Sequence, residues 1–366
     1  MQLTPETIYQ YLNKRQLING EAVVKGHFMV HPVKTRNNIM KIIMEPENSL
    51  FVKQMEKDLV TTNLFLREIS AYNFFKNNNE FSAIGSAIPE LLDYDDDHNI
   101  MVTQLLYNSQ NLYEYYAITK NFDLNLAREQ AAILSSFHIM PNNETDTGMF
   151  PKMLPWILQL DQHNADQFFV NNEASTNIIS LIKQNHVIQD TLINLALSYK
   201  FTHLIHGDIK WINLLITKDE KGFSQKLIDW ELADIGDPMW DVAGLMQSYV
   251  SAWLLGFDNN DPTGYKLPEH MQPYDIKNTQ SSAKAFLYEY ISLQKYPEYY
   301  HTEFLIRIIQ LTAARIIQTS LEGITYHSKI EANNMRCIQL AFNIMNDPIT
   351  ALDELFNIKV YDHVPG

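Results

Sequence analysis

The sequence contains very little cysteine, because Cys337 is the single one among 366 residues. One thiol cannot form an internal disulfide, so nothing in the chain calls for an oxidising compartment. No stretch reaches the roughly 18 consecutive apolar residues typical of a membrane-spanning helix. The first residues also lack the basic start and the apolar run of a secretory signal peptide. We therefore expect a cytoplasmic protein with no disulfide and no membrane partner.

Positive charge is scarce as well. The chain has 28 Lys and Arg residues against 43 Asp and Glu residues, which gives a formal net charge of −15. Such an acidic balance argues against nucleic acid as a partner. The hydrophobic fraction of 46 % is that of a globular protein with ample material for a core. The length suggests two or three domains, or two unequal lobes that share one cleft.

Short apolar stretches alternate with turns over the first hundred residues. This pattern predicts strands over residues 22–33, 38–44, 49–55, 88–92 and 100–106. Residues 62–76 read instead as a helix, with Leu64, Glu68, Tyr72 and Phe75 on one face. The prediction is an α+β lobe with a five-stranded antiparallel sheet and one long helix.

Beyond residue 110 the pattern becomes mainly helical. Long apolar helices are expected over residues 239–255 and 303–320. We predict an N-terminal lobe over 1–104 and a C-terminal helical lobe over 105–366, joined by a short hinge at about residues 104–108.

Four polar residues have the chemistry that phosphoryl transfer needs. Asp208 can accept the proton of an attacking hydroxyl, and Lys210 can reach a transferred phosphate. Asn213 and Asp229 offer the hard oxygen donors that Mg²⁺ prefers. Each residue alone could be a turn, a cap or an ion-pair partner. In this order and at these spacings, they predict phosphotransfer.

The same region resembles a known family. The segments are His206-Gly-Asp-Ile-Lys-Trp-Ile-Asn213, Ile228-Asp-Trp-Glu231 and Gly236-Asp-Pro-Met-Trp-Asp241, and they are similar to the aminoglycoside phosphotransferase and choline kinase-like family. The resemblance implies a protein-kinase-like two-lobe fold with ATP and Mg²⁺ as cofactors. It also implies Asp208 as the catalytic base, Asn213 and Asp229 as metal ligands, and Asp241 as the anchor of the catalytic loop, which His206 would orient. Many family members carry a histidine where this chain has Lys210, so the usual antibiotic acceptor is not implied.

The N-terminal lobe contains a candidate lysine–glutamate pair. Lys53 follows the apolar residues Phe51 and Val52, and Glu68 lies on the apolar face of the expected helix. A carboxylate on such a face needs a partner. A Lys53–Glu68 pair would hold the ammonium group near the α- and β-phosphates of ATP. The alternative is two unrelated surface charges.

Two further segments are candidates for nucleotide contacts. The turn 34–38 has no glycine, so the glycine-rich loop of protein kinases is absent. Thr35, Arg36 and Asn37 could contact phosphate there, or the segment could be a plain polar hairpin. Gln104 and Leu106, at the end of the fifth expected strand, would offer backbone hydrogen bonds to the adenine.

The acceptor is left open by these residues. Trp211, Glu231 and Asp234 are expected on the acceptor side. A kinase for small-molecule hydroxyls is one hypothesis. A second is a kinase for Ser or Thr in a precursor peptide, because the motif also looks similar to phosphotransferase-like proteins of lanthipeptide-type pathways. A third is a non-catalytic nucleotide-binding pseudokinase.

Overall fold

The computed structural model describes residues 1–18, 20–24, 27–45, 48–139, 148, 150–160, 173–219, 222–254, 275–294, 302–327 and 329–360. The chain folds into two compact units that interleave along the sequence. We call Met1–Asn111, Gly148–Phe150 and Asn213–Ala233 the sheet unit. We call Leu112–Thr147, Pro151–Ile212 and Asp234–Gly366 the helical unit. The division at a hinge near residues 104–108 stays a prediction.

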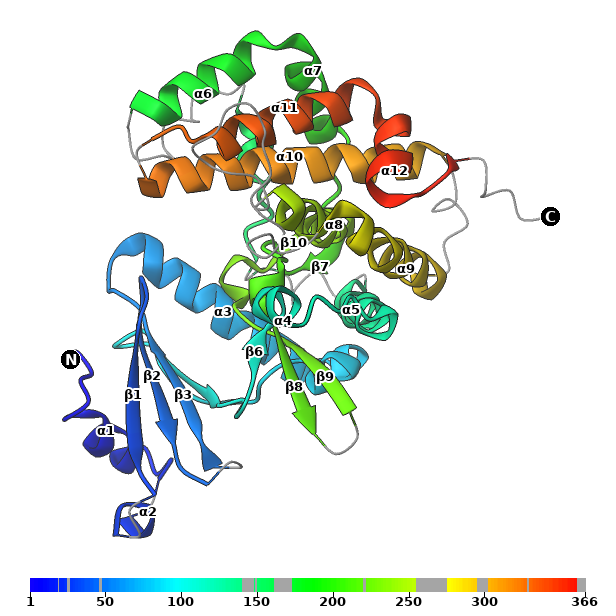
Figure 1. Ribbon diagram of the computed structural model, residues 1–366. Coiled ribbons are helices and arrows are strands. Elements are labelled where there is room, and N and C mark those ends of the chain that lie inside the picture. Colours follow the sequence, from blue (N-terminus) through cyan, green and yellow to red (C-terminus); the bar gives the residue numbers. More distant parts are fainter. Residues whose placement is uncertain are drawn as a thin grey trace. The chain divides into compact units, whose positions relative to one another are not determined.

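A five-stranded antiparallel sheet dominates the sheet unit and confirms the predicted α+β fold (Figure 1). Its strands are β1 (Met29–Lys34), β2 (Asn38–Ile43), β3 (Leu50–Gln54), β4 (Leu91–Asp95) and β5 (Ile100–Gln104), in the order β1-β2-β3-β5-β4. The strand predicted over residues 22–33 is wrong in its first half, because Gly20–Val24 forms helix α2. A short apolar run fits a helix as well as a strand, and only the surrounding fold decides.

Alternation along the strands sets the two faces of this sheet. Leu50 and Val52 of β3 are buried with Ile8 and Leu12 of α1 (Ile8–Lys14). Successive side chains of a strand point to opposite faces. Lys53 therefore points away from this cluster, toward the long helix of the unit.

That long helix is α3 (Leu59–Asn77), and it confirms the helix predicted over residues 62–76. It begins at Asp58, whose side chain accepts hydrogen bonds from the backbone N–H groups of Val60 and Thr61. Its buried residues include Glu68 among aromatic and aliphatic neighbours. The 3-10 helix η2 (Asn79–Ala87) follows it.

A second, three-stranded sheet completes the sheet unit. It consists of β6 (Gln110–Asn111), β8 (Leu214–Asp219) and β9 (Gly222–Leu227), in the order β6-β8-β9. β9 ends two residues before Asp229. The sheet therefore fixes where the segment of the expected metal ligand begins.

The helical unit is built mainly from long helices (Figure 1). They are α4 (Leu112–Thr119), α5 (Leu124–Phe137), α6 (Glu173–Gln184), α7 (His186–Leu197), α8 (Pro238–Leu254), α9 (Ile276–Gln294), α10 (Thr302–His327), α11 (Ala332–Asn346) and α12 (Pro348–Phe356), with the 3-10 helix η4 (Trp156–Gln159). β7 (His203–Ile205) and β10 (Asp234–Gly236) pair antiparallel in this unit. Residues 206–213, which contain the expected base, follow β7, and α8 follows β10.

Helix α10 is long and apolar enough to cross a membrane by length and composition, over Thr302–Ile324. Of that window 72 % is buried within the fold. The core helix of a soluble protein passes the same test, so this is a weak indication of a membrane span. Packing against α8 and α11 accounts for the apolar composition of α10.

His203 should make stability depend on pH. Burial lowers the pKa of His203 from 6.5 to about 4. A neutral buried ring therefore stabilises the fold above about pH 6.5, and this contribution is lost as the pH falls toward about 4. The shift corresponds to at most about 3 kcal/mol. Urea unfolding of wild type and His203→Gln across this pH range measures the effect.

We expect the unfolding free energy of His203→Gln to fall less on acidification than that of wild type. The exposed His186, at the start of α7, provides the matched control His186→Gln, which should keep the wild-type slope. Equal slopes for wild type and His203→Gln would contradict the prediction.

Candidate functional site

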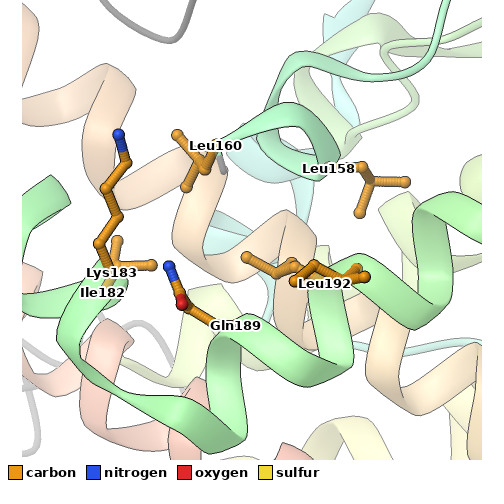
Figure 2. A pocket seen from close by; sticks show the side chains of 7 residues that line it. Leu158, Leu160, Ile182, Lys183, Gln189 and Leu192 are labelled. Atoms are coloured by element: carbon orange, nitrogen blue, oxygen red, sulfur yellow. The ribbon is translucent and has the colours of Figure 1, made fainter. Parts of the chain in front are cut away.

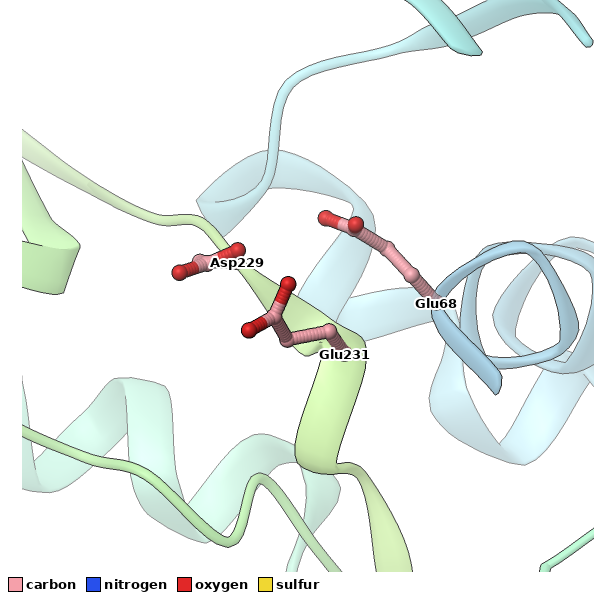
Figure 3. Close-up of side chains that lie close together, drawn as sticks. All are labelled: Glu68, Asp229 and Glu231. Carbon is pink, nitrogen blue, oxygen red and sulfur yellow. The ribbon is translucent and has the colours of Figure 1, made fainter. Parts of the chain in front are cut away.

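One lysine and three carboxylates form a cluster in the sheet unit. Lys53 Nζ lies 2.8 Å from Glu68 Oε2, 2.7 Å from Asp229 Oδ1 and 3.3 Å from Glu231 Oε2. Figure 3 shows the carboxylate of Glu68 reaching from α3 toward those of Asp229 and Glu231. The pair suggested by the sequence is therefore present, and it is buried: the Lys53 and Glu68 side chains are 6 % and 2 % exposed. We call these four residues the lysine cluster.

The lysine cluster contains more acidic than basic groups, with three carboxylates around one ammonium group. Burial lowers the pKa of Lys53, but Glu68, Asp229 and Glu231 together outweigh burial and the net shift is upward. Burial raises the pKa of Glu68 to about 7, and Lys53 opposes this only in part because two other carboxylates share it. An added cation would therefore be stabilised here.

The three carboxylates of the cluster have the donor chemistry of a Mg²⁺ site, and in this structure Lys53 Nζ pairs with each of them. One oxygen each from Glu68, Asp229 and Glu231 can be chosen so that all lie within 4.8 Å of one another. Carboxylate oxygens are the hard donors that this ion prefers. Among the described residues, these carboxylates form the one group of three or more His, Cys, Asp or Glu side chains that are close enough to hold a metal ion.

The backbone at Asp229 has an unusual conformation. Its φ of 68° and ψ of 61° lie in the left-handed region, which Asp tolerates better than most residues. The N–H of Ile228 donates to the carbonyl of Asn213 at 3.0 Å, which ties this segment to the start of β8. Trp230 is fully buried, with its ring 4.8 Å from that of Phe75. The fold thus holds Asp229 in place on both sides.

The turn between β1 and β2 contacts the lysine cluster. An Arg36 nitrogen lies 2.6 Å from Glu231 Oε1. Thr35 Oγ1 donates to the carbonyl of Asn37 at 2.7 Å, which shapes the turn. Because the Arg36 side chain is 58 % exposed, the ion pair adds little stability. The phosphate-binding role of this turn and the acceptor-side role of Glu231 stay predictions.

Two backbone N–H groups of the expected hinge region already donate hydrogen bonds within the protein. The N–H of Gln104 donates to the carbonyl of Glu90, and that of Leu105 donates to Ser49, both at 2.9 Å. A donor N–H for a nucleobase from this segment would therefore come from a residue after Leu105. Adenine binding here stays a prediction.

The second group of site residues lies in the helical unit. Lys210 Nζ is 2.6 Å from Asp208 Oδ2, and an Arg315 nitrogen is 3.4 Å from Asp208 Oδ1. The N–H of Asp208 donates to His206 Nδ1 at 3.2 Å. Between them Gly207 has a φ of 81°, which a residue without Cβ adopts readily. Burial lowers the pKa of Lys210, but Asp208 outweighs it and the net shift is upward.

Asp241 ties this loop to α8. Its carboxylate accepts hydrogen bonds from the N–H groups of His206 at 2.6 Å and Gly207 at 2.9 Å. His138 Nε2 lies 3.1 Å from the same carboxylate, and His138 Nδ1 lies 2.8 Å from the Tyr290 hydroxyl. A fully buried carboxylate with this many partners fixes backbone rather than binding a ligand.

Residues 45–274 match the model of the phosphotransferase enzyme family. The chain belongs to this family. The predicted resemblance is thereby confirmed, whereas membership of a lanthipeptide-pathway subgroup stays a prediction. None of the curated proteins matches the chain.

Solved structures of kinases share the fold of this phosphotransferase. A choline/ethanolamine kinase family protein from Mesorhizobium loti is 15 % identical, with 93 % of this chain and 94 % of that one covered at a TM-score of 0.51. Choline kinase LicA from Streptococcus pneumoniae is 14 % identical, with coverages of 91 % and 99 % and a TM-score of 0.54. APH(2″)-IIa, in its complex with streptomycin and ATP, is 16 % identical, with coverages of 94 % and 99 % and a TM-score of 0.54. The likeness establishes the kinase-like fold.

Two residues expected on the acceptor side have structural contacts in the phosphotransferase. Asp234 accepts hydrogen bonds from the N–H groups of Lys152 at 2.7 Å and Met153 at 2.9 Å. Trp211 is 2 % exposed, and its ring lies 4.8 Å from those of both Tyr116 and Tyr249. These contacts favour structural roles, and contact of either residue with an acceptor stays a prediction.

Two charged residues of α10 near Asp208 could not be identified from the motifs. Arg315 and Glu322 lie on this helix, more than a hundred residues after Asp208. Burial raises the pKa of Glu322, and Asp208 adds to the shift. The sequence did contain one indication: a charged residue within an apolar helix needs a partner, so its position suggests a buried interaction.

A small pocket in the helical unit is separate from these residues (Figure 2). Its lining is mainly aliphatic and consists of Leu158, Leu160, Ile182, Lys183, Gln189, Leu192 and Ile193. None of the charged site residues contributes to it. The pocket holds no acid or nucleophile that could carry phosphotransfer.

Gly244 should be essential for the close approach of α8 to the Ile209 carbonyl. A Cβ at Gly244 would lie 2.5 Å from the carbonyl oxygen of Ile209, which is backbone and cannot move away freely. We expect Gly244→Ala to lower the unfolding free energy by about 2 kcal/mol, as overpacking does. Urea unfolding of wild type and variant measures this.

Gly323 of α10 supplies the control. A Cβ there would meet its nearest atom, Asn334 Nδ2, at 3.7 Å, which is an ordinary contact. Gly323→Ala should therefore raise stability by about 0.5–1 kcal/mol through helix propensity. The close approach would be refuted if both alanine variants changed stability in the same direction.

Proposed function

We propose that this chain transfers the γ-phosphate of ATP to a hydroxyl of a small molecule in the presence of Mg²⁺. The observation that carries the proposal is the lysine cluster, in which a buried Lys53 is held by Glu68 and by Asp229. Membership of the phosphotransferase enzyme family supports the reaction type. A family member with a decayed site would not be expected to keep a buried lysine with this set of partners.

Nucleotide and metal are assigned to the sheet unit. Glu68 keeps the Lys53 ammonium in place to bind the α- and β-phosphates. Asp229 and Asn213 are the proposed metal ligands, and Glu231 joins them because its carboxylate belongs to the same cluster. When bound, Mg²⁺ would neutralise charge on the phosphate oxygens. The turn residues Thr35, Arg36 and Asn37 and the hinge residues Gln104 and Leu106 complete the proposed nucleotide contacts.

The base is assigned to the helical unit. Asp208 accepts the proton of the acceptor hydroxyl, and Lys210 binds the transferred phosphate. The 2.6 Å pair between them supports this assignment, because it leaves Lys210 charged beside the reacting oxygen. His206 and Asp241 hold the loop that carries Asp208.

A small-molecule acceptor is supported by the kinases that share this fold. Those named above include a choline kinase and a phosphotransferase bound to streptomycin and ATP. A peptide acceptor and a non-catalytic nucleotide binder are the other outcomes that an assay can distinguish. We further propose a cytoplasmic location without nucleic-acid or membrane partners.

Asp208→Asn should remove the base while it preserves nucleotide binding. We expect kcat to fall by about 10²–10⁴-fold, which is the usual contribution of general base catalysis. ADP release is measured with Mg²⁺-ATP and a panel of choline, ethanolamine, aminoglycosides, sugars and a Ser-containing peptide. ATP affinity, from calorimetry, should be unchanged.

The exposed Asp190 of α7 gives the matched control Asp190→Asn, which should retain wild-type turnover. Equal kcat for wild type and Asp208→Asn would contradict the assignment of the base. If wild type phosphorylated the peptide and none of the small molecules, the acceptor would be a peptide. ATP binding without any transfer would favour the non-catalytic binder.

Asp229→Asn tests the metal assignment separately. Loss of one carboxylate from the cluster should abolish the gain in ATP affinity that Mg²⁺ provides, because the amide carries no charge. Calorimetric titration of ATP with and without Mg²⁺ measures that gain. Asp96→Asn, at an exposed position of the sheet unit, is the control and should keep it. A full Mg²⁺ effect in Asp229→Asn would show that the metal binds elsewhere.

A further inference from the structure

Arg315 is a buried charge on the mainly apolar helix α10. The residue is 3 % exposed. A guanidinium group removed from water needs partners for its donors. Its nitrogens donate to the carbonyls of Ile209 at 3.0 Å and Gly207 at 3.4 Å, and one lies 3.4 Å from Asp208 Oδ1. One side chain thus contacts three consecutive residues of the catalytic segment.

Trp240 of α8 holds the guanidinium from another side. The Arg315 Cζ atom lies 5.0 Å from the centroid of the Trp240 ring, at cation–π distance. Trp240 Nε1 in turn donates to the Gly207 carbonyl at 3.0 Å. Arg315 and Trp240 therefore share the Gly207 carbonyl as an acceptor, which limits the movement of the segment.

Gly244 of α8 allows the close approach on which this contact depends. The Ile209 carbonyl occupies the space that a Cβ at Gly244 would need, and an Arg315 nitrogen lies 3.4 Å from the same point. A carbonyl pressed against a helix loses access to water, so it needs a donor. Arg315 supplies that donor, and the same nitrogen faces Asp208.

The two oxygens of Asp208 differ in their partners. Oδ1 faces Arg315, whose side chain is 4 % exposed, and Oδ2 faces Lys210, whose side chain is 32 % exposed. Arg315 is therefore surrounded by protein, whereas Lys210 is partly exposed to solvent. Only Lys210 is placed to exchange its partner for a phosphate.

We propose that Arg315 is a positioning residue that fixes the rotamer of Asp208. It holds Oδ1 and the backbone on both sides, and leaves Oδ2 as the oxygen that receives the proton. This rests on the proposed function, in which Asp208 is the base. In that step the acceptor O–H proton passes to Oδ2 as the acceptor oxygen bonds to the γ-phosphorus. The bond from that phosphorus to the bridging oxygen breaks, and ADP leaves with its electron pair.

Arg315→Lys is the sharpest test, because lysine keeps the charge but lacks the planar fork. We expect kcat to fall by about 100-fold, the cost of a misplacement of roughly 1 Å at a reacting group. The KM for ATP should stay at the wild-type value. In Arg315→Gly, added guanidinium ion should restore part of kcat without raising the thermal unfolding midpoint, a result that a purely structural arginine would not give.

Arg307→Lys is the matched control on the same helix. Arg307 binds Asp237 and the Ser198 carbonyl but has no contact with residues 207–209 among the described interactions. The Arg307→Lys variant should have a lower thermal stability than wild type and the same kcat. If Arg315→Lys behaves like Arg307→Lys and guanidinium gives no rescue, the positioning role is overturned.

The test separates this role from the proposed function. No phosphotransfer by wild type overturns the proposed function, and wild-type kcat in Asp208→Asn overturns the assignment of the base on which this role rests. Turnover lost in Asp208→Asn but intact in Arg315→Lys overturns the positioning role alone. Crystal structures of wild type and Arg315→Lys add a readout without an acceptor: a turned Asp208 carboxylate in the variant supports the role, and an unchanged one contradicts it. Arg315→Gln replaces Arg315→Lys should the latter fail to fold.

Discussion

A charge taken out of water must be met by an opposite charge or by hydrogen bonds, and this constraint governs the buried charges of both units. In the sheet unit, Lys53 is buried on β3 and three carboxylates converge on it. Arg36 pairs with one of the three, Glu231, and the remaining excess of negative charge favours a further cation. This excess of negative charge is the reason why we propose a metal ion at this cluster.

The helical unit meets the same constraint with a different solution. Asp241 is fully buried and is balanced by backbone N–H groups and by His138. Arg315 is balanced by backbone carbonyls and by the face of Trp240. Both charges are used to shape one short loop, and that loop presents Asp208. Precision at the proposed base thus comes from buried groups that act through the backbone of this loop.

Local patterns explain what the sequence could predict. The spacing of Leu64, Glu68 and Tyr72 placed a carboxylate on a buried helix face, and a partner at Lys53 followed from the cost of burying it. The role of Arg315 could not be predicted in this way, because its partners depend on how α10 packs on α8. The aromatic neighbours of Trp211 could not be predicted either, because Tyr116 and Tyr249 are distant from it in the sequence. The α2 segment shows that short apolar runs do not distinguish a helix from a strand.

Phosphotransfer itself is the claim on which the assigned roles depend. The most direct measurement is ³¹P NMR of the wild-type protein with ATP, Mg²⁺ and the acceptor panel. We expect the γ-phosphate resonance of ATP to decline while ADP and a phosphate monoester of one acceptor appear together. Unchanged ATP, or ADP formed with inorganic phosphate alone in the presence of every acceptor, would contradict the claim.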